Sequence, residues 1–149
     1  MKQCIVVAVF FLALSMGCAT SSQPKAAPPA WEMEKQVTHL ASVSGLSLHL
    51  LRWGAVEQQE ALLLLRGVDH PWADKVVVHQ VKPCRHGKCY STEVNGRPWT
   101  TLLLGKESAE LYLPFLEEDS PLRLSYVTDT PGLPVPEDLA KMFESQQRE

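Results

Sequence analysis

The chain has 149 residues, 45% of them hydrophobic and 21% charged, and its formal net charge at pH 7 is −3. This length is typical of one globular domain that can bury a core, and it argues against two domains. The lysines and arginines are scattered singly along the sequence, so the charge pattern does not indicate a nucleic-acid-binding surface.

The first residues have the pattern of an export signal. Lys2 precedes an uncharged apolar run, Ile5 to Leu14, which at about ten residues has the length of a signal-peptide hydrophobic region. A membrane-spanning helix needs about 20 such residues, and no cluster of lysines or arginines follows the run as a stop-transfer flank. We therefore expect a removable signal peptide over residues 1–17.

The apolar run ends in Ser15, Met16, Gly17 and Cys18. This stretch resembles the lipobox of bacterial lipoproteins, in which an acylated cysteine becomes the mature N-terminus. The resemblance implies that Cys18 is lipidated and, because Ala19 rather than Asp follows it, that the protein lies on the periplasmic face of the outer membrane. The alternative is ordinary cleavage after Ala19, which would give a soluble periplasmic or secreted protein.

A linker is expected between Cys18 and the folded domain. Residues 18–30 contain no large apolar side chain and are rich in Ser, Pro and Ala, so they cannot join a core. Residues 31–131 are then expected to form a β domain, and residues 132–149 a C-terminal amphipathic helix and tail.

The expected β domain consists of short apolar runs separated by turn residues. From Leu46 onward leucines alternate with Ser47 and His49, which indicates a strand with one polar face. By contrast, Ala61 to Leu65 does not alternate, which predicts a central strand covered on both faces. The pattern predicts an all-β fold, an antiparallel β-sandwich or barrel of about seven or eight strands. The expected strands are Gln36 to Ser44, Leu46 to Trp53, Ala61 to Val68, Lys75 to Lys82, Cys89 to Val94, Trp99 to Leu104, Ala109 to Phe115 and Leu122 to Thr128.

Two turn motifs predict hairpins. Asn95-Gly96 is the stronger, because both residues accept the positive φ of a type I′ turn, and His86-Gly87 is a weaker example. A two-residue loop at His86-Gly87 would place Cys84 opposite Cys89 and His79 opposite Val94. The alternation then predicts that His79 faces the core and that both cysteines face solvent.

The chain has four cysteines, of which Cys4 leaves with the signal peptide and Cys18 is the expected lipid site. In an exported protein the remaining pair, Cys84 and Cys89, predicts a structural disulfide. The residues between them add one imidazole, that of His86, which is too few ligands for a zinc site, and the spacing differs from the CxxC of thiol oxidoreductases. We expect neither a metal site nor a cofactor.

The segment Asp69-His70-Pro71-Trp72-Ala73-Asp74 is the candidate binding loop. It joins two expected strands, and Asp69, His70, Trp72 and Asp74 offer carboxylates, an imidazole and a large aromatic ring. We expect it to be exposed at one end of the domain, with Trp72 as an anchor for a partner. The alternative is a structural turn in which Trp72 plugs one end of the core.

A short helix is expected near the C-terminus. Pro136 suits a first helical turn, and Glu137 and Asp138 place negative charge at its positive end. Leu139, Met142 and Phe143 recur at helical spacing and form one apolar stripe. We expect this stripe to pack as a lid on the β domain, with a partner-binding helix as the alternative.

These features favour a non-enzymatic function. The sequence contains no GxSxG elbow, and its five histidines are spread over strands and loops without a catalytic arrangement. His39 and His49 are expected on a polar face. We expect an envelope interaction or assembly module whose partner is an envelope protein or polymer. One alternative is a small periplasmic ligand- or metal-binding protein or hydrolase that uses Asp69, His70, Asp74 and His79, and another is an anchored inhibitor of an exogenous enzyme.

Overall fold

The computed structural model describes residues 31–116, 120–128 and 130–148. The expected signal peptide, Cys18 and the linker lie outside these residues. Within them, no helix is both long enough and apolar enough to cross a bilayer.

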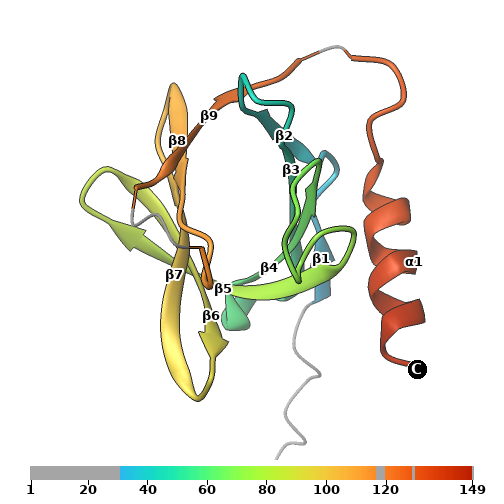
Figure 1. Ribbon diagram of the computed structural model, residues 1–149. Coiled ribbons are helices and arrows are strands. Elements are labelled where there is room, and N and C mark those ends of the chain that lie inside the picture. The colour runs from blue at the N-terminus through green and yellow to red at the C-terminus, as the bar shows by residue number, and fades with distance from the viewer. Residues whose placement is uncertain (1–30, 117–119, 129, 149) are drawn as a thin grey trace, which may run out of the picture.

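The fold is a closed antiparallel β-barrel with one extra strand and one helix (Figure 1). Each strand from β2 to β9 pairs with the next along the chain, and β9 returns to pair with β2, which closes an eight-stranded barrel. The short strand β1 adds to the edge of β3. The elements are β1 Trp31–Met33, β2 Thr38–Ala41, β3 Ser47–Ala55, the 3-10 turn η1 Val56–Gln58, β4 Glu60–Arg66, β5 Val76–Cys84, β6 Gly87–Val94, β7 Arg97–Leu104, β8 Ser108–Leu111, β9 Leu122–Tyr126 and α1 Pro136–Gln146.

This architecture confirms the all-β prediction, and the closed sheet is a barrel rather than a sandwich. Each of the eight expected strands overlaps an observed strand, while β1 was not expected. The reason is visible in β1 itself, since Trp31, Glu32 and Met33 show no run of alternating apolar residues and gain their pairing from the edge of β3.

Strand β4 is covered on both faces, as its unbroken leucine run predicted. Leu63 and Leu65 point into the barrel and join the main core, while Leu62 and Leu64 point outward into a second core. All four side chains have 0% exposure. Because successive side chains of a strand point to opposite faces, such burial requires one layer inside the barrel and another outside it.

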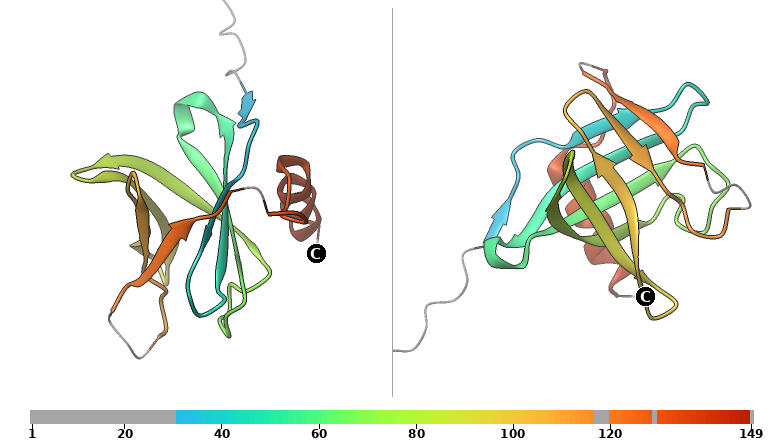
Figure 2. Two further views of the ribbon diagram at one scale, coloured as in Figure 1. Left: turned by 90° about the horizontal axis from the view of Figure 1, so that it is seen from above. Right: turned by 90° about the vertical axis from the view of Figure 1, so that its left-hand side faces the viewer.

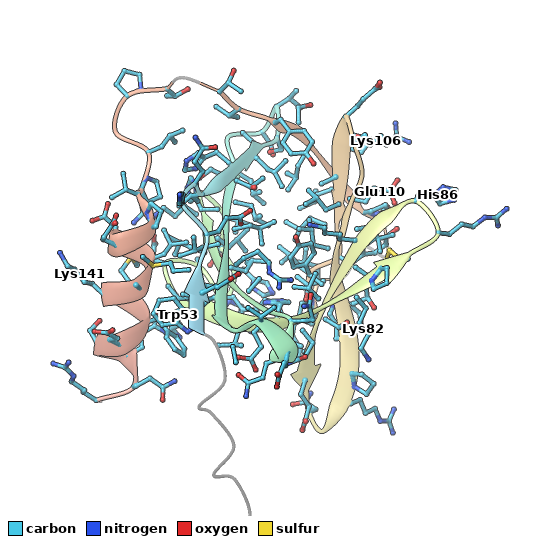
Figure 3. All side chains as sticks on the ribbon, turned by 180° about the vertical axis from the view of Figure 1, so that it is seen from behind. Trp53, Lys82, His86, Lys106, Glu110 and Lys141 are labelled. Carbon is cyan, nitrogen blue, oxygen red and sulfur yellow. A yellow bond between two sulfur atoms is a disulfide. The ribbon has the colours of Figure 1, made fainter. Side chains whose placement is uncertain are left out.

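Helix α1 is the outer layer (Figures 1 and 2). Leu139 is fully buried against the outward side chains of β3, β4 and β5, and Met142 and Phe143 are half-buried beside it. The ring of Phe143 meets that of Trp53 edge to face, with centroids 6.1 Å apart (Figure 3). The expected lid is therefore confirmed.

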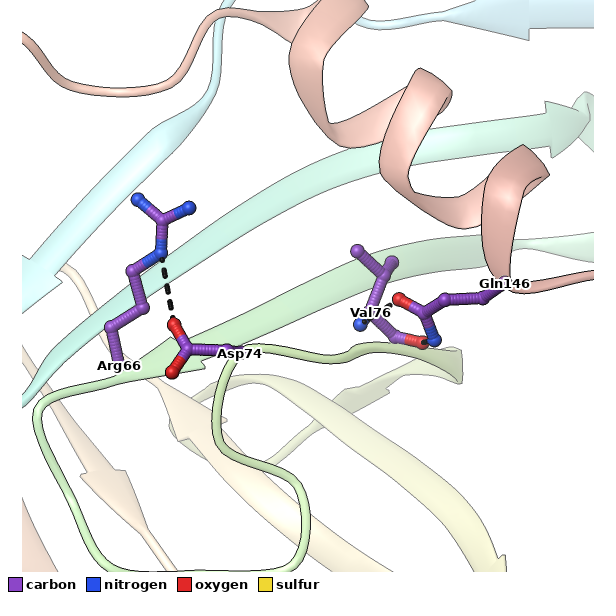
Figure 4. Close-up of polar contacts among 4 residues, drawn as sticks. All are labelled: Arg66, Asp74, Val76 and Gln146. Atoms are coloured by element: carbon purple, nitrogen blue, oxygen red, sulfur yellow. Dashed lines mark hydrogen bonds and ion pairs between the residues drawn. The ribbon is translucent and has the colours of Figure 1, made fainter. Parts of the chain in front are cut away.

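Polar contacts fix both ends of the helix. At its start, the carboxylate of Asp138 accepts a hydrogen bond of 3.1 Å from the Val135 N–H. At its other end, the side-chain amide of Gln146 bonds the N–H of Val76 at 2.8 Å and the carbonyl of Val76 at 3.3 Å (Figure 4). Gln146 thereby satisfies the backbone N–H and carbonyl of Val76 at the start of β5.

The Asn95-Gly96 turn forms as predicted, with φ of 52° and 73°. The other hairpin differs from the prediction by two residues: Cys84 pairs with Gly87 and Lys82 with Cys89, so the loop is Arg85-His86. Gly87 is not needed for the turn. It lies in β6 with φ of 151°, where a Cβ would overlap the carbonyl oxygen of Leu104 in β7.

The predicted pairing of His79 with Val94 is wrong for the same reason. A shift of two residues leaves every side chain on its expected face, because the side-chain period of a strand is two. His79 and Val81 accordingly lie inside the barrel, and Lys82 and Cys84 lie outside it. The predicted disulfide between Cys84 and Cys89 is present, with Cα atoms 5.8 Å apart at diagonal rather than opposed positions.

The second core makes a testable prediction about stability. Because the Leu139 side chain has 0% exposure, we expect Leu139→Ala to lower the free energy of unfolding by about 2–5 kcal/mol in urea titrations. The exposed Lys141 on the same helix is the control, and Lys141→Ala should change it by less than about 0.5 kcal/mol. Equal, small effects of both substitutions would show that α1 does not cover the barrel.

Candidate functional site

The up-and-down topology gives the barrel two different ends (Figure 2). One end, the loop end, holds the connections 42–46, 67–75 and 95–96 and the described parts, 112–116 and 120–121, of the connection between β8 and β9. The opposite end, the N-terminal end, holds β1, η1, the Arg85-His86 loop and the 105–107 turn. The candidate binding loop therefore lies at the loop end, on the far side of the barrel from Trp31.

His70 joins the candidate loop to the connection between β8 and β9. Its Nε2 lies 2.7 Å from the carbonyl oxygen of Pro114 and donates to it, because a carbonyl can only accept. Its Nδ1 accepts from the Trp72 N–H at 3.1 Å. With both ring nitrogens bonded and only 7% of its surface exposed, His70 holds two loops together, which corrects the expectation of an exposed loop histidine.

Trp72 takes the plugging position that was the alternative to an exposed anchor. Its side chain is half-buried against the main core. Its ring is edge-on to His70 at a centroid distance of 5.4 Å and to the buried His79 at 6.1 Å. Trp72 thus closes the loop end of the barrel between two imidazoles.

The two aspartates of the loop are exposed and stand apart from these rings. Asp74 has a positive φ of 57° and forms an ion pair with Arg66, at 3.5 Å between Oδ1 and Nε (Figure 4). Both partners are substantially exposed, so this pair adds little to stability. Asp69 is also exposed.

His79 lies inside the barrel with 0% exposure, as the alternation predicted. Its Nδ1 donates to the carbonyl of Val77 at 3.1 Å, and its Nε2 accepts from the hydroxyl of Thr101 at 3.0 Å. Burial lowers the pKa of His79 to about 4, against a smaller raising effect of the Val77 carbonyl. His79 is therefore a neutral imidazole whose nitrogens are both in use.

The residues of the alternative enzymatic or metal site are thus only partly brought together. His70 and His79 both touch Trp72, while Asp74 faces Arg66. Across the described ranges, no three His, Cys, Asp or Glu side chains lie close enough to hold a metal ion.

A second histidine pair corrects the expected polar face of β2 and β3. The register sets His39 directly opposite His49, and their Nδ1 atoms are 2.8 Å apart. His49 is buried, and this burial, with the charges of His39 and Arg66, lowers its pKa to about 4. The pair is a cross-strand hydrogen bond outside the barrel, which the sequence could not reveal without the register.

The loop end also carries an apolar surface that the sequence analysis missed. Trp99, Phe115 and Leu116 are large apolar side chains with exposures of 38%, 62% and 39%. With Pro98 they form what we call the aromatic rim. In the sequence, Pro98-Trp99 and Pro114-Phe115-Leu116 each lie beside a turn, and this placement of apolar residues could have identified the rim.

Three members of the aromatic rim, Pro98, Trp99 and Phe115, border a shallow hollow of about 430 Å³. The hollow is lined by Val94, Asn95, Arg97, Pro98, Trp99, Pro114 and Phe115. The indole N–H of Trp99 donates to the Tyr112 carbonyl at 2.9 Å, which fixes the orientation of this ring.

Phe115 is the most exposed member of the rim and has strained backbone geometry. Its φ is 68°, in the left-handed region that a bulky residue rarely adopts. Its ring stacks on His70 at a centroid distance of 6.4 Å. A chain of ring contacts therefore runs from His79 in the core through Trp72 and His70 to Phe115 at the surface.

The neutral state of His79 makes stability depend on pH. In the unfolded chain a histidine binds a proton below about pH 6.5, whereas folded His79 does so only near pH 4. The contribution of neutral His79 to the free energy of unfolding is therefore complete above pH 6.5, and it is lost as the pH falls toward 4. We expect the loss of unfolding free energy between pH 7.5 and pH 5 to be smaller in His79→Gln than in the wild type by about 2 kcal/mol. Equal losses in the two proteins, measured by urea unfolding, would contradict this assignment.

The loop end thus combines a chain of ring contacts, whose two imidazoles are each hydrogen-bonded to neighbouring groups, with an exposed apolar rim. Rings in such a chain gain a fixed orientation from their neighbours on both sides. No protein-family model matches this chain, and no curated protein or solved structure matches it significantly.

Proposed function

We propose that the protein is a non-enzymatic interaction module of the bacterial envelope, anchored through lipid on Cys18, and that the aromatic rim is its partner-binding surface. The observation that carries the proposal is the exposure of Trp99 and Phe115 around one hollow, with the exposed Leu116 next to Phe115 in the chain and Phe115 held in a left-handed conformation. Contiguous exposed apolar side chains are typical of interaction sites.

The energetics of Phe115 support a binding role. A left-handed backbone costs a non-glycine residue about 1–2 kcal/mol, and a ring that is 62% exposed recovers little of that by burial. The backbone strain and the exposure of the ring are both explained if the ring becomes buried in a complex, because aromatic side chains supply much of the binding energy at interfaces.

The lining of the hollow indicates the chemistry of the partner. Arg97 is the one charged residue among its lining residues, so a complementary partner presents an apolar side chain next to a carboxylate. Pro98 and Pro114 stiffen the backbone on two sides of the hollow, which lowers the entropy cost of binding. We therefore propose an envelope protein as the partner.

The position of the rim fits an anchored protein. The chain enters the barrel at β1, at the N-terminal end, so the rim faces away from the point where the linker joins the domain. Residues 18–30 can span at most about 45 Å. A lipid on Cys18 would hold the N-terminal end near the membrane and leave the rim available to partners.

The anchor is tested by metabolic labelling with a clickable fatty acid. We expect the wild type to be labelled and Cys18→Ala to be unlabelled, because acylation requires the Cys18 thiol. Cys4→Ala is the control and should be labelled like the wild type. Equal labelling of Cys18→Ala, or a mature N-terminus at Thr20, would remove the lipid anchor from the proposal.

The rim is tested by photo-crosslinking in intact cells. A photoreactive phenylalanine analogue at position 115 should capture a defined protein, while the same analogue at exposed Val135, beside helix α1, should not. Phe115→Gly should reduce capture by an analogue at position 99 at least about tenfold, the effect of losing a contact worth 1.4 kcal/mol.

Phe115→Gly also separates binding from folding. Glycine adopts a φ of 68° without strain, so this variant should be as stable as the wild type or more stable by about 1 kcal/mol. Lost capture with retained stability supports a binding role for the ring. Undiminished capture by the Phe115→Gly variant, or equal capture from positions 115 and 135, would contradict the proposal.

A further inference from the structure

The hairpin between β5 and β6 concentrates positive charge. Between Lys75 and Glu93 the chain has no acidic residue but three cations, Lys82, Arg85 and Lys88. The fold adds Lys106 from the turn between β7 and β8, which lines one hollow with Arg85 and His86. We call this group the basic hairpin; its members, Lys82, Arg85, His86, Lys88 and Lys106, are all exposed.

Neighbouring acids offset part of this charge, because Lys88 shares a hollow with Glu32 and Glu34, and Lys82 shares one with Glu93. Within residues 31–116, 120–128 and 130–148, the one ion pair joins Arg66 to Asp74, far along the barrel from this hairpin. Glu107 is the single acid in the hollow with Arg85 and Lys106. Glu110, the acid of the neighbouring hollow, already accepts a hydrogen bond of 3.0 Å from the Tyr112 hydroxyl. Within the described residues none of these acids forms an ion pair with the basic hairpin, and residues 76–92 contain no acid, so the hairpin itself carries net positive charge.

The hairpin is also held in shape. The disulfide between Cys84 and Cys89 closes its tip, and Gly87 lies directly against the backbone of Leu104. Lys82, His86 and Lys106 point away from the barrel, on the side opposite helix α1 (Figure 3). A loop closed in this way loses less entropy when it binds than an open one.

The helix side of the domain has the opposite net charge. Helix α1, across the barrel from the hairpin, carries the exposed acids Glu137, Asp138 and Glu144 and one exposed cation, Lys141. This separation of charge would turn the hairpin side of the domain toward a negative surface and the helix side away from it.

We infer that the basic hairpin docks on an anionic phospholipid surface. The hairpin loop lies at the N-terminal end of the barrel, where the chain enters through β1, so an anchored domain carries it within reach of the membrane. This orientation rests on the proposed lipid anchor. Basic side chains beside an anchor bind anionic headgroups, and one lipid chain alone holds a protein weakly, so the hairpin would supply a second attachment.

The test uses the full chain reconstituted into vesicles, either of pure phosphatidylcholine or with phosphatidylglycerol added. Acetylation rates of single lysines are measured by mass spectrometry. We expect Lys82, Lys88 and Lys106 to react at least about threefold more slowly on the anionic vesicles, since headgroup contact shields them. High salt should abolish the difference, and Lys141 on α1 should react equally on both vesicles.

Matched variants show whether the hairpin itself is responsible. Lys82→Gln, Arg85→Gln and Lys88→Gln combined should abolish the protection of Lys106. Arg123→Gln, Lys141→Gln and Arg148→Gln combined remove three exposed cations elsewhere and should leave that protection intact. Thermal melting of both variants checks that they are folded.

Two results would overturn the inference. One is an equal acetylation rate on neutral and anionic vesicles. The other is stronger protection by soluble polyglutamate, at the same concentration of negative charge, which would assign the hairpin to an acidic protein instead. Fatty-acid labelling of Cys18 tests the anchor separately, so failure of the anchor and failure of the hairpin are distinguishable.

Discussion

The structure depends on the burial of strand β4 from both sides. Its outward leucines, Leu62 and Leu64, have no solvent exposure only because Leu139 and its neighbours on α1 cover them. Its inward leucines, Leu63 and Leu65, fill the barrel. A barrel of eight strands is just wide enough for side chains to fill it. The core inside the barrel and the second core under the helix therefore bury the same strand on its two faces.

That arrangement explains why the two ends of the barrel are free to differ. The barrel wall and the helix stabilise the fold, so the connections at each end can expose side chains that bind partners. At the loop end, polar groups are used internally: His70 ties two connections together, and Trp72 closes the core between two imidazoles. This internal bonding lets the aromatic rim be both exposed and rigid.

The N-terminal end has the opposite character. There a disulfide-closed hairpin exposes cations instead of aromatic rings. The aromatic rim at one end and the basic hairpin at the other make the two ends of the domain chemically different. In an anchored protein this difference would separate attachment to the membrane from contact with a partner.

Much of the fold could be predicted because it depends on local patterns. The unbroken leucine run of β4 specified two covered faces, Asn95-Gly96 specified a turn, and the spacing of Leu139, Met142 and Phe143 specified a helix with one apolar side. The disulfide followed from a pair of nearby cysteines. Even the error of two residues in the hairpin left each side chain on its expected face, since the period of a strand is two.

The candidate surfaces depended on contacts between distant parts of the chain, which local patterns do not contain. His70 and Pro114 become neighbours when the sheet closes into a barrel and the connections gather at its ends, and Arg85 and Lys106 become neighbours when β6 pairs with β7. The sequence by itself determined strands β2 to β9, the helix, the disulfide and the inward face of His79. Only the tertiary structure decided that Trp72 is a plug, that Phe115 is the exposed ring, and that singly scattered cations form one surface, because closure of the sheet sets which loops meet.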